Sequence, residues 1–192
     1  MKYKIVEYSD DLDLTEFYKL AESKGYTNNS SKKKLVDCFS KEKEYQVWIL
    51  YYEDKPIGSF AAHTFNEMGE GSYRIAARTC LIDYRITSAR EGSLAGKGDA
   101  FKCITTNQHI TGQFFIPTCI EWAGKHNDLY LTSNDSGSKS QRRVHNIYFP
   151  MMEKSGQVDR VCEMMCRGDV QTIWKLNVEK FYEVLNNNHR WY

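Results

Sequence analysis

The stretch from Tyr73 to Ile86 reads Y-R-I-A-A-R-T-C-L-I-D-Y-R-I and predicts the strand on which the fold depends. Its first half places apolar or small side chains at every second position, and its second half repeats the alternation in the opposite phase. A strand has a side-chain period of two, so its phase changes only where an extra residue is inserted. We therefore predict a β-bulge near Thr79 to Ile82. The alternative is a strand covered on both faces, in which the phase carries little information.

The residues before this strand predict a β-meander. The runs Q-V-W-I-L-Y-Y and I-G-S-F-A-A-H-T-F flank the turn Glu53-Asp54-Lys55-Pro56, which is typical of a hairpin. A Gly-rich turn at 66–72 then leads into the long strand. Earlier still, residues 2–8 predict a first strand, and the spacing of apolar residues predicts two helices, at 13–25 and 32–42.

The residues after the strand are less regular at first. Residues 88–112 have little periodicity and carry glycines at Gly92, Gly96 and Gly98; such long loops are often functional or mobile. A helix at 114–125 directly precedes a short strand at 128–134, which implies a crossover to a parallel neighbour.

The remaining elements complete one domain. A helix from Gln141 to about Lys154 contains Pro150, which should kink or split it. A hairpin about the turn 167–169 and a terminal helix at 178–188 follow. The length of 192 residues suits a single domain spanning 1–192.

Composition excludes several classes of function. Charge is balanced, with 26 basic against 25 acidic residues, so we expect no nucleic-acid surface. No apolar run approaches the roughly 20 residues of a membrane span. The six cysteines form no C-x-x-C pair and are read as free thiols in a reducing cytoplasm. The five histidines are unpatterned, so we expect no metal site.

The order of elements resembles that of the GNAT superfamily of N-acetyltransferases over most of residues 2–176. The local sequence at 51–62, Y-Y-E-D-K-P-I-G-S-F-A-A, is similar to the family's second hairpin. The resemblance implies an α/β fold with a mixed, mostly antiparallel central sheet of about seven strands flanked by helices. Divergent chains of this length also look like ones that tailed phages encode.

The resemblance implies where acetyl-CoA would bind. In the family, the bulged strand offers backbone groups to the pantetheine arm and acyl carbonyl, which points to Thr79, Leu81 and Ile82. The following helix presents its N-terminal amides to the pyrophosphate. Gly96 and Gly98 are similar to the family's phosphate loop, although Ser93 stands in place of its Arg or Gln. The loop 88–112 therefore either binds phosphate or is an insertion.

A further match is Asn134, which resembles the family's Asn that hydrogen-bonds the cofactor arm; a turn or helix cap explains it equally well. Many family members use a Tyr to protonate the departing thiolate, and Met152 stands at the matching position. Tyr148, one turn earlier, is our candidate acid, with packing as its alternative role. His63 is our candidate general base, because an imidazole titrates near neutrality, and a structural role is its alternative.

The sequence therefore predicts an N-acyltransferase that moves an acetyl group from acetyl-CoA to an amine, on a small molecule or a protein. The alternative is a catalytically inactive GNAT-like module that serves binding or assembly, in which case the aromatic tail 189–192 and the long loop are candidate contact surfaces. Domains of this kind often pair through their C-terminal strands, so a homodimer is one expectation.

Overall fold

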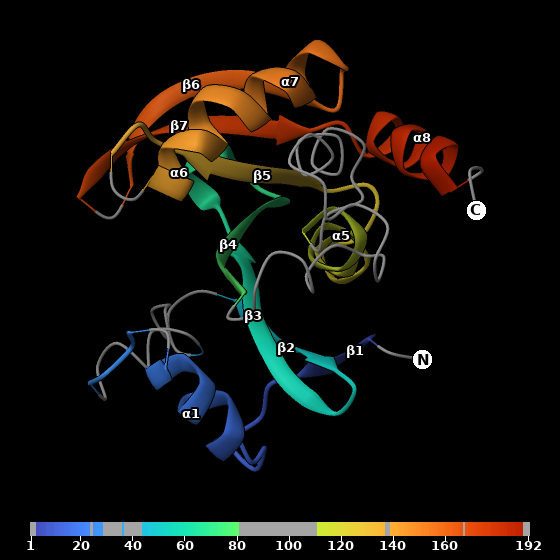
Figure 1. Cartoon of the computed structure of the whole chain (residues 1–192). Helices are drawn as coiled ribbons and strands as arrows, with labels where there is room; N and C mark the ends of the chain where they lie inside the picture. The colour runs from blue at the N-terminus through green and yellow to red at the C-terminus, as the bar shows by residue number, and fades with distance from the viewer. Residues whose placement is uncertain are drawn as a thin grey trace.

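A computed structural model describes residues 3–23, 25–28, 36, 44–80, 111–136, 139–166 and 168–189. Seven strands form one sheet in the order β1-β2-β3-β4-β5-β7-β6 (Figure 1). The strands are β1 (Tyr3–Glu7), β2 (Tyr45–Tyr52), β3 (Lys55–Thr64), β4 (Ser72–Cys80), β5 (Asp128–Ser133), β6 (Val158–Cys166) and β7 (Asp169–Leu176). The helices are α1 (Thr15–Ser23), α5 (Ile116–Ala123), α6 (Lys139–Arg143), α7 (Phe149–Lys154) and α8 (Val178–His189), with a 3-10 turn η1 (Asn66–Met68) and π turns η2 (Thr111–Phe115) and η3 (Val144–Tyr148).

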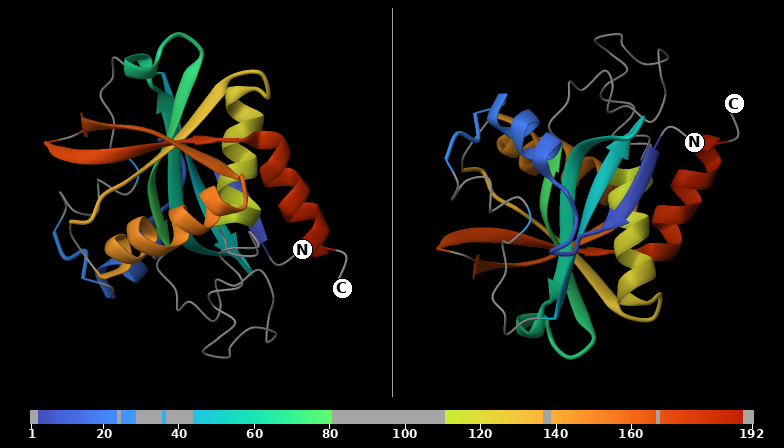
Figure 2. Two further views of the ribbon diagram at one scale, coloured as in Figure 1. Left: turned by 90° about the horizontal axis from the view of Figure 1, so that it is seen from above. Right: turned by 90° about the horizontal axis from the view of Figure 1, so that it is seen from below.

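The sheet is mixed and mostly antiparallel, as the sequence predicts. Strands β1 to β4 form a meander, and β6 and β7 form a hairpin that joins the sheet through β7. Within the described residues only β4 and β5 are parallel neighbours. The expected crossover is present, because α5 directly precedes β5 in the chain. Seen end-on, the β6–β7 hairpin crosses the direction of β2 and β3 (Figure 2).

The β2–β3 turn fixes the pairing of the hairpin in the middle of the meander. Glu53 and Asp54 form its two-residue loop with φ angles of 47° and 62°. Positive φ at both central positions gives a turn whose twist matches that of the flanking strands. The turn predicted from the sequence is therefore present without a glycine.

One face of the sheet carries the main core. Helices α5, α7 and α8 pack against apolar side chains of β2, β3, β5 and β7. Phe60 lies at its centre, stacked on Trp48 at 5.1 Å and on Phe115 at 4.1 Å between ring centroids. This face therefore holds both crossover segments that flank β5.

The opposite face is covered by α1. Phe17 and Ala21 of α1 are fully buried against a cluster that includes Val47 and Ile49 of β2. Val36 is buried in the same cluster. The rest of the helix expected at 32–42 lies outside the described residues.

The helix expected between β5 and β6 is a run of three segments, α6, η3 and α7. The N–H of Phe149 donates to the carbonyl of Val144, a π-type step, and Pro150 follows in the first turn of α7. Proline has no N–H to donate and crowds the preceding turn, so a local change of helical register is expected beside it. The predicted kink at Pro150 thus takes the form of a π turn. Pro117 follows η2 in the same way.

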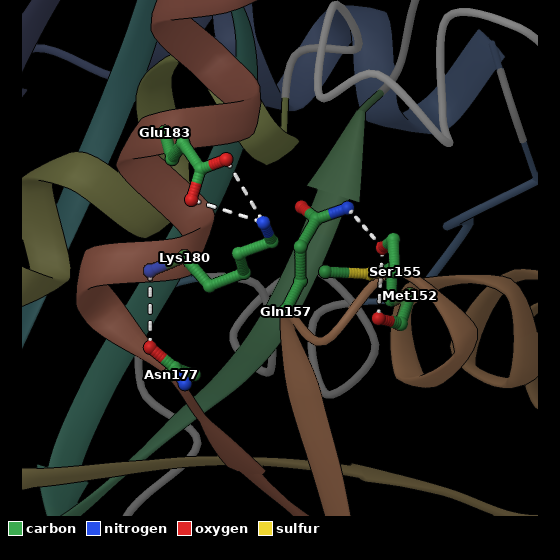
Figure 3. A network of polar contacts seen from close by, with 6 residues as sticks. All are labelled: Met152, Ser155, Gln157, Asn177, Lys180 and Glu183. Carbon is green, nitrogen blue, oxygen red and sulfur yellow. Dashed lines mark hydrogen bonds and ion pairs between the residues drawn. The ribbon is translucent and has the colours of Figure 1, made fainter.

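A polar network fixes the ends of α7 and α8 against β6 and β7 (Figure 3). Gln157, directly after the φ +75° residue Gly156, donates its N–H to the carbonyl of Met152 and closes α7. The carbonyl of Gln157 accepts the N–H of Asn177, whose side chain accepts the N–H of Lys180 and caps α8. These hydrogen bonds therefore fix the C-terminal end of α7, where the segment between β5 and β6 enters β6.

No helix among the described residues combines the length and apolar character that crossing a bilayer requires. Of the loop expected at 88–112, residues 88–110 lie outside the described residues, and 111–112 belong to η2.

Candidate functional site

Strands β4 and β5 pair over three positions and then separate. The partners are Ser72 with Asp128, Tyr73 with Leu129 and Arg74 with Tyr130. Beyond them β4 continues to pair with β3, and β5 with β7, but no longer with each other. Figure 1 shows the two strands running in different directions past the pair. We call the separated segments, 75–80 and 131–133, the β4–β5 opening.

A bulge lies in β4 at this opening. Ala61 pairs with Ala76 and Ser59 with Thr79, so Phe60 alone faces Ala77 and Arg78. One extra residue in β4 is the insertion that the phase change predicts. The bulge begins two residues before the predicted span of Thr79 to Ile82. The sequence shows a change in side-chain alternation only where the next apolar residues occur, which is after the inserted residue. The prediction of a bulge is confirmed and its position is corrected.

The other end of the β4–β5 pair is tied, and we call residues 71–72 and 127–128 the tied end. The N–H of Asp128 donates to the carbonyl of Gly71 at 3.0 Å. A Cβ on Gly71, whose φ is +73°, would lie 3.0 Å from Oδ1 of Asn127. The side chain of Asn127 is itself held, since its Nδ2 donates to the carbonyl of Ala123 at 2.6 Å.

An ion pair adds to the tied end. Nζ of Lys175 lies 2.8 Å from Oδ2 of Asp128. The hydrogen bond from the ammonium to this carboxylate raises the pKa of Lys175. Both side chains are more than two-fifths exposed, so the pair contributes less than about 1 kcal/mol.

The half-buried side chain of Arg74 spans the start of the opening on the α1 side of the sheet. Nη2 of Arg74 donates to Oγ1 of Thr132 at 2.7 Å, although Arg74 pairs with Tyr130, two residues earlier on β5. The guanidinium also lies over the ring of Phe65 at 5.8 Å. The two strands are therefore held at a fixed separation where they begin to part.

Three side chains meet on the other side of the sheet, at the end of β5. Ser133 Oγ accepts the Nε1 hydrogen of Trp174 at 2.8 Å and lies 2.9 Å from Nδ1 of His145. Ser133 and Trp174 are buried and His145, in η3, is half-buried. Positions 133, 145 and 174 are far apart in the sequence, so no local pattern announces this cluster.

No protein-family model matches the sequence, and no curated protein matches it significantly. The fold, by contrast, matches solved acetyltransferases. Aminoglycoside acetyltransferase AAC(6')-Ib in complex with coenzyme A and kanamycin aligns over 94% of this chain and 98% of its own, with 12% identity and a TM-score of 0.51.

Two further structures agree. Aminoglycoside N-acetyltransferase AAC(6')-Ib11 aligns over 94% of this chain and 99% of its own at 10% identity, with a TM-score of 0.52. AAC(6')-Ib in complex with ribostamycin and coenzyme A aligns over 95% and 97% at 11% identity, with a TM-score of 0.50. This chain has the GNAT acyltransferase fold. The resemblance read from the sequence is confirmed at the level of fold, and nothing in these comparisons supports a phage origin.

The GNAT fold separates the two residues predicted to be catalytic. His63 is 2% exposed on β3, and its Nδ1 lies 2.6 Å from the carbonyl oxygen of Thr64. It alternates with Phe60 and Ala62 and so points away from the main core, on the α1 side. Tyr148 is half-buried in η3 on the core side, with the guanidinium of Arg143 at 5.9 Å from its ring centroid. Their catalytic roles stay predictions.

The residues predicted to bind the cofactor are only partly described. Thr79 lies in β4 just past the bulge, and Asn134 is half-buried directly after β5, so both flank the opening. Leu81, Ile82, Gly96 and Gly98 lie outside the described residues. Met152, at the position of the family's Tyr, is buried in the main core.

The facing edges of the two strands determine what the β4–β5 opening could bind. Where β4 and β5 part, backbone N–H and carbonyl groups on the facing edges do not pair with each other and are suited to bind an extended, amide-containing chain. Ser59, opposite Thr79, adds a buried hydroxyl that makes no hydrogen bond with the described residues. No group of three or more potential metal ligands occurs in the described part of the chain.

Proposed function

We propose that this protein is an acyl-CoA-dependent N-acyltransferase that moves an acetyl group from acetyl-CoA to an amine. The observation that carries the proposal is the separation of β4 and β5 beside a β4 bulge, in a chain with the GNAT acyltransferase fold. The structures that share the fold include complexes with coenzyme A and with aminoglycosides, which are amines. An amine acceptor on a small molecule or a protein is therefore part of the proposal.

The chemistry that we propose needs little more than positioning. The pantetheine arm lies along the opening, and its amides pair with the free edges of β4 and β5. The thioester carbonyl accepts a hydrogen bond from a backbone N–H at or after the bulge, near Thr79, which polarises the carbonyl for attack by the amine. Leu81, Ile82 and Asn134 extend the contacts to the arm, and Gly96 and Gly98 are proposed to contact its phosphates.

The test is calorimetric titration of the full chain with acetyl-CoA and, separately, with CoA. We expect micromolar binding, equivalent to about 8 kcal/mol, and thermal stabilisation of about 2.7 kcal/mol at one hundred times Kd. The absence of both heat and stabilisation at millimolar cofactor would refute the proposal. A bulky substitution such as Gly96→Leu should weaken binding without unfolding the protein, whereas unchanged affinity would remove residue 96 from the site.

Tyr148 and His63 are the candidate general acid and general base that the sequence predicts. If Tyr148 is the acid, Tyr148→Phe lowers turnover while cofactor affinity is retained; full activity in this variant returns Tyr148 to packing. His63→Gln is judged in the same way, with its folded stability measured in parallel because His63 is buried.

The second candidate function is a binding module that has the fold without the chemistry. Met152 is buried at the family's Tyr position, and Met165 and Val170, which pair on the β6–β7 hairpin, are 67% and 54% exposed. This alternative predicts no cofactor binding, together with self-association through the hairpin that Met165→Lys abolishes in sedimentation experiments. A homodimer and a cytoplasmic location stay predictions.

A further inference from the structure

The cluster of Ser133, His145 and Trp174 is rigid. Trp174 stacks on Phe149 at 5.1 Å with an interplanar angle of 13°, and its backbone pairs with Leu131. An indole N–H only donates, so Trp174 uses one lone pair of Ser133 Oγ and fixes the hydroxyl in place. Ser133 is 6% exposed and thereby presents a fixed partner to the imidazole of His145.

The two ring nitrogens of His145 have different surroundings, because only Nδ1 contacts Ser133. Nδ1 faces Ser133 Oγ, so the ring orientation is set from the protein side. Within the described residues no hydrogen bond engages Nε2. Nε2 can therefore exchange a proton while the bond at Nδ1 keeps the ring in one orientation. General acid–base catalysis by a histidine uses this arrangement.

The position of the cluster matches the β4–β5 opening. Ser133 is the last residue of β5 and lies three residues beyond Tyr130, the last residue paired with β4, which is roughly 10 Å along the strand. His145 lies in the π turn η3, and π turns inside helices are frequent at functional sites. Ser133 is not suited to be a nucleophile, because it is buried and both of its neighbours contact its oxygen.

We propose that His145 is the residue that carries the proton from the attacking amine to the sulfur of the departing thiol, through Nε2. This inference rests on the proposed acyltransferase function. The amine nitrogen bonds to the thioester carbonyl carbon, and its surplus proton passes to Nε2. The C–S bond then breaks with its electron pair on sulfur, and Nε2 returns the proton to give a thiol and an amide. The imidazole ends as it began, so atoms and charge balance.

In this role Nδ1 keeps its hydrogen and donates to Ser133 Oγ, whose two lone pairs serve Trp174 and His145. Ser133 and Trp174 are positioning residues, because they act through the ring of His145. Tyr148 lies three residues further along the same helical run and is the competing donor of the proton.

The first test uses NMR spectra of the full chain labelled with ¹⁵N-histidine, which report each imidazole nitrogen. His145→Gln assigns the signals, and exposed His126 serves as the internal control. CoA should shift the Nε2 resonance of His145, whereas desulfo-CoA, which lacks the sulfur, should shift it much less. Equal shifts with both compounds, or no shift while calorimetry records binding, would overturn the inference alone. If neither compound binds, the proposed acyltransferase function is refuted, and the role of His145 is refuted with it.

The second test is kinetic, with an acceptor amine found by screening. His145→Gln should lower turnover by about 10²–10⁴-fold with acetyl-CoA affinity retained, as expected for loss of an acid–base group. His126→Gln should leave turnover unchanged. Ser133→Ala and Trp174→Phe should alter the pH profile of turnover, which a structural role alone would not. Turnover that falls in Tyr148→Phe and not in His145→Gln would give the proton to Tyr148 and contradict the proposal.

Discussion

The two ends of the β4–β5 pair differ in what holds them. At the tied end, the N–H of Asp128 donates to the carbonyl of Gly71, and the side chain of Asn127 donates to the carbonyl of Ala123. At the opening, the strands share no backbone pairing, and side chains from distant elements stand at its edges. Local hydrogen bonds therefore hold the tied end, whereas the opening is where the proposed function places the cofactor. Substitutions at the first should therefore change stability alone, while substitutions at the second should also change function.

The largest effect is expected opposite the bulge. Phe60→Ala removes a fully buried ring that stacks on Trp48 and Phe115, and should lower the free energy of unfolding by about 3–5 kcal/mol. Denaturant unfolding measures it, with Phe60→Leu as the milder control at less than about 1.5 kcal/mol. A loss below 1 kcal/mol in Phe60→Ala (roughly the size of a surface substitution) would mean that the opening does not depend on this packing.

The next effect belongs to the tied end. Gly71→Ala combines backbone strain at φ +73° with a Cβ that meets Oδ1 of Asn127, and should cost about 2–3 kcal/mol. The matched control is Gly168→Ala, whose φ is +86° and whose Cβ meets nothing within 4 Å, at about 1–2 kcal/mol. Equal losses in the two variants would show that the contact with Asn127 is unimportant. Cofactor affinity should be unchanged in both folded variants.

This difference between the ends also separates what the sequence predicts from what it does not. The meander, the turn at Glu53–Asp54 and the parallel β4–β5 neighbours follow from alternation, turn residues and a crossover helix, which are local signals. The bulge is detectable because the side-chain phase must change, although the pattern places it two residues late.

The site was harder to predict because its contacts are not local. The alternation of β3 puts His63 opposite in direction to Phe60, but the sequence does not say which face η3 and α7 will cover. His145 gains its partner Ser133 only when η3 packs beside the end of β5, and β7 supplies Trp174 as the second partner of Ser133. From the sequence, Tyr148 and His63 are therefore chosen as candidate acid and base by residue type alone. No sequence pattern distinguishes His145 from the other four histidines.

A third prediction concerns the cluster at the opening. Ser133→Ala leaves the buried Nε1 hydrogen of Trp174 without its acceptor and should cost about 1–3 kcal/mol. Trp174→Phe keeps an aromatic ring against Phe149 but removes the donor and leaves a small cavity in the core, so it should cost about 1–3 kcal/mol. In a double-mutant cycle followed by denaturant unfolding, the double variant should lose less than the sum. Strict additivity would contradict the hydrogen bond.

The smallest effect is the pH dependence of the tied end. The pKa of Lys175 is raised by its bond to Asp128, so the stabilisation is present below about pH 10.4, the ordinary value, and is lost as pH rises through the folded pKa. Burial raises the pKa of Tyr182 and acts in the same direction. Lys175→Met should flatten the alkaline fall in stability by less than about 1 kcal/mol. An unchanged alkaline limb in thermal unfolding would exclude the ion pair as a contributor.

In the proposed function, the β4–β5 opening binds the acyl-CoA arm while the tied end stays fixed. Backbone amide NMR spectra recorded with and without acetyl-CoA test this most directly, because they report each strand residue separately. We expect large shifts for residues 77–79 and 131–133, and small ones for Gly71 and Asn127. Shifts concentrated at the tied end, or an unchanged spectrum at millimolar acetyl-CoA, would contradict it.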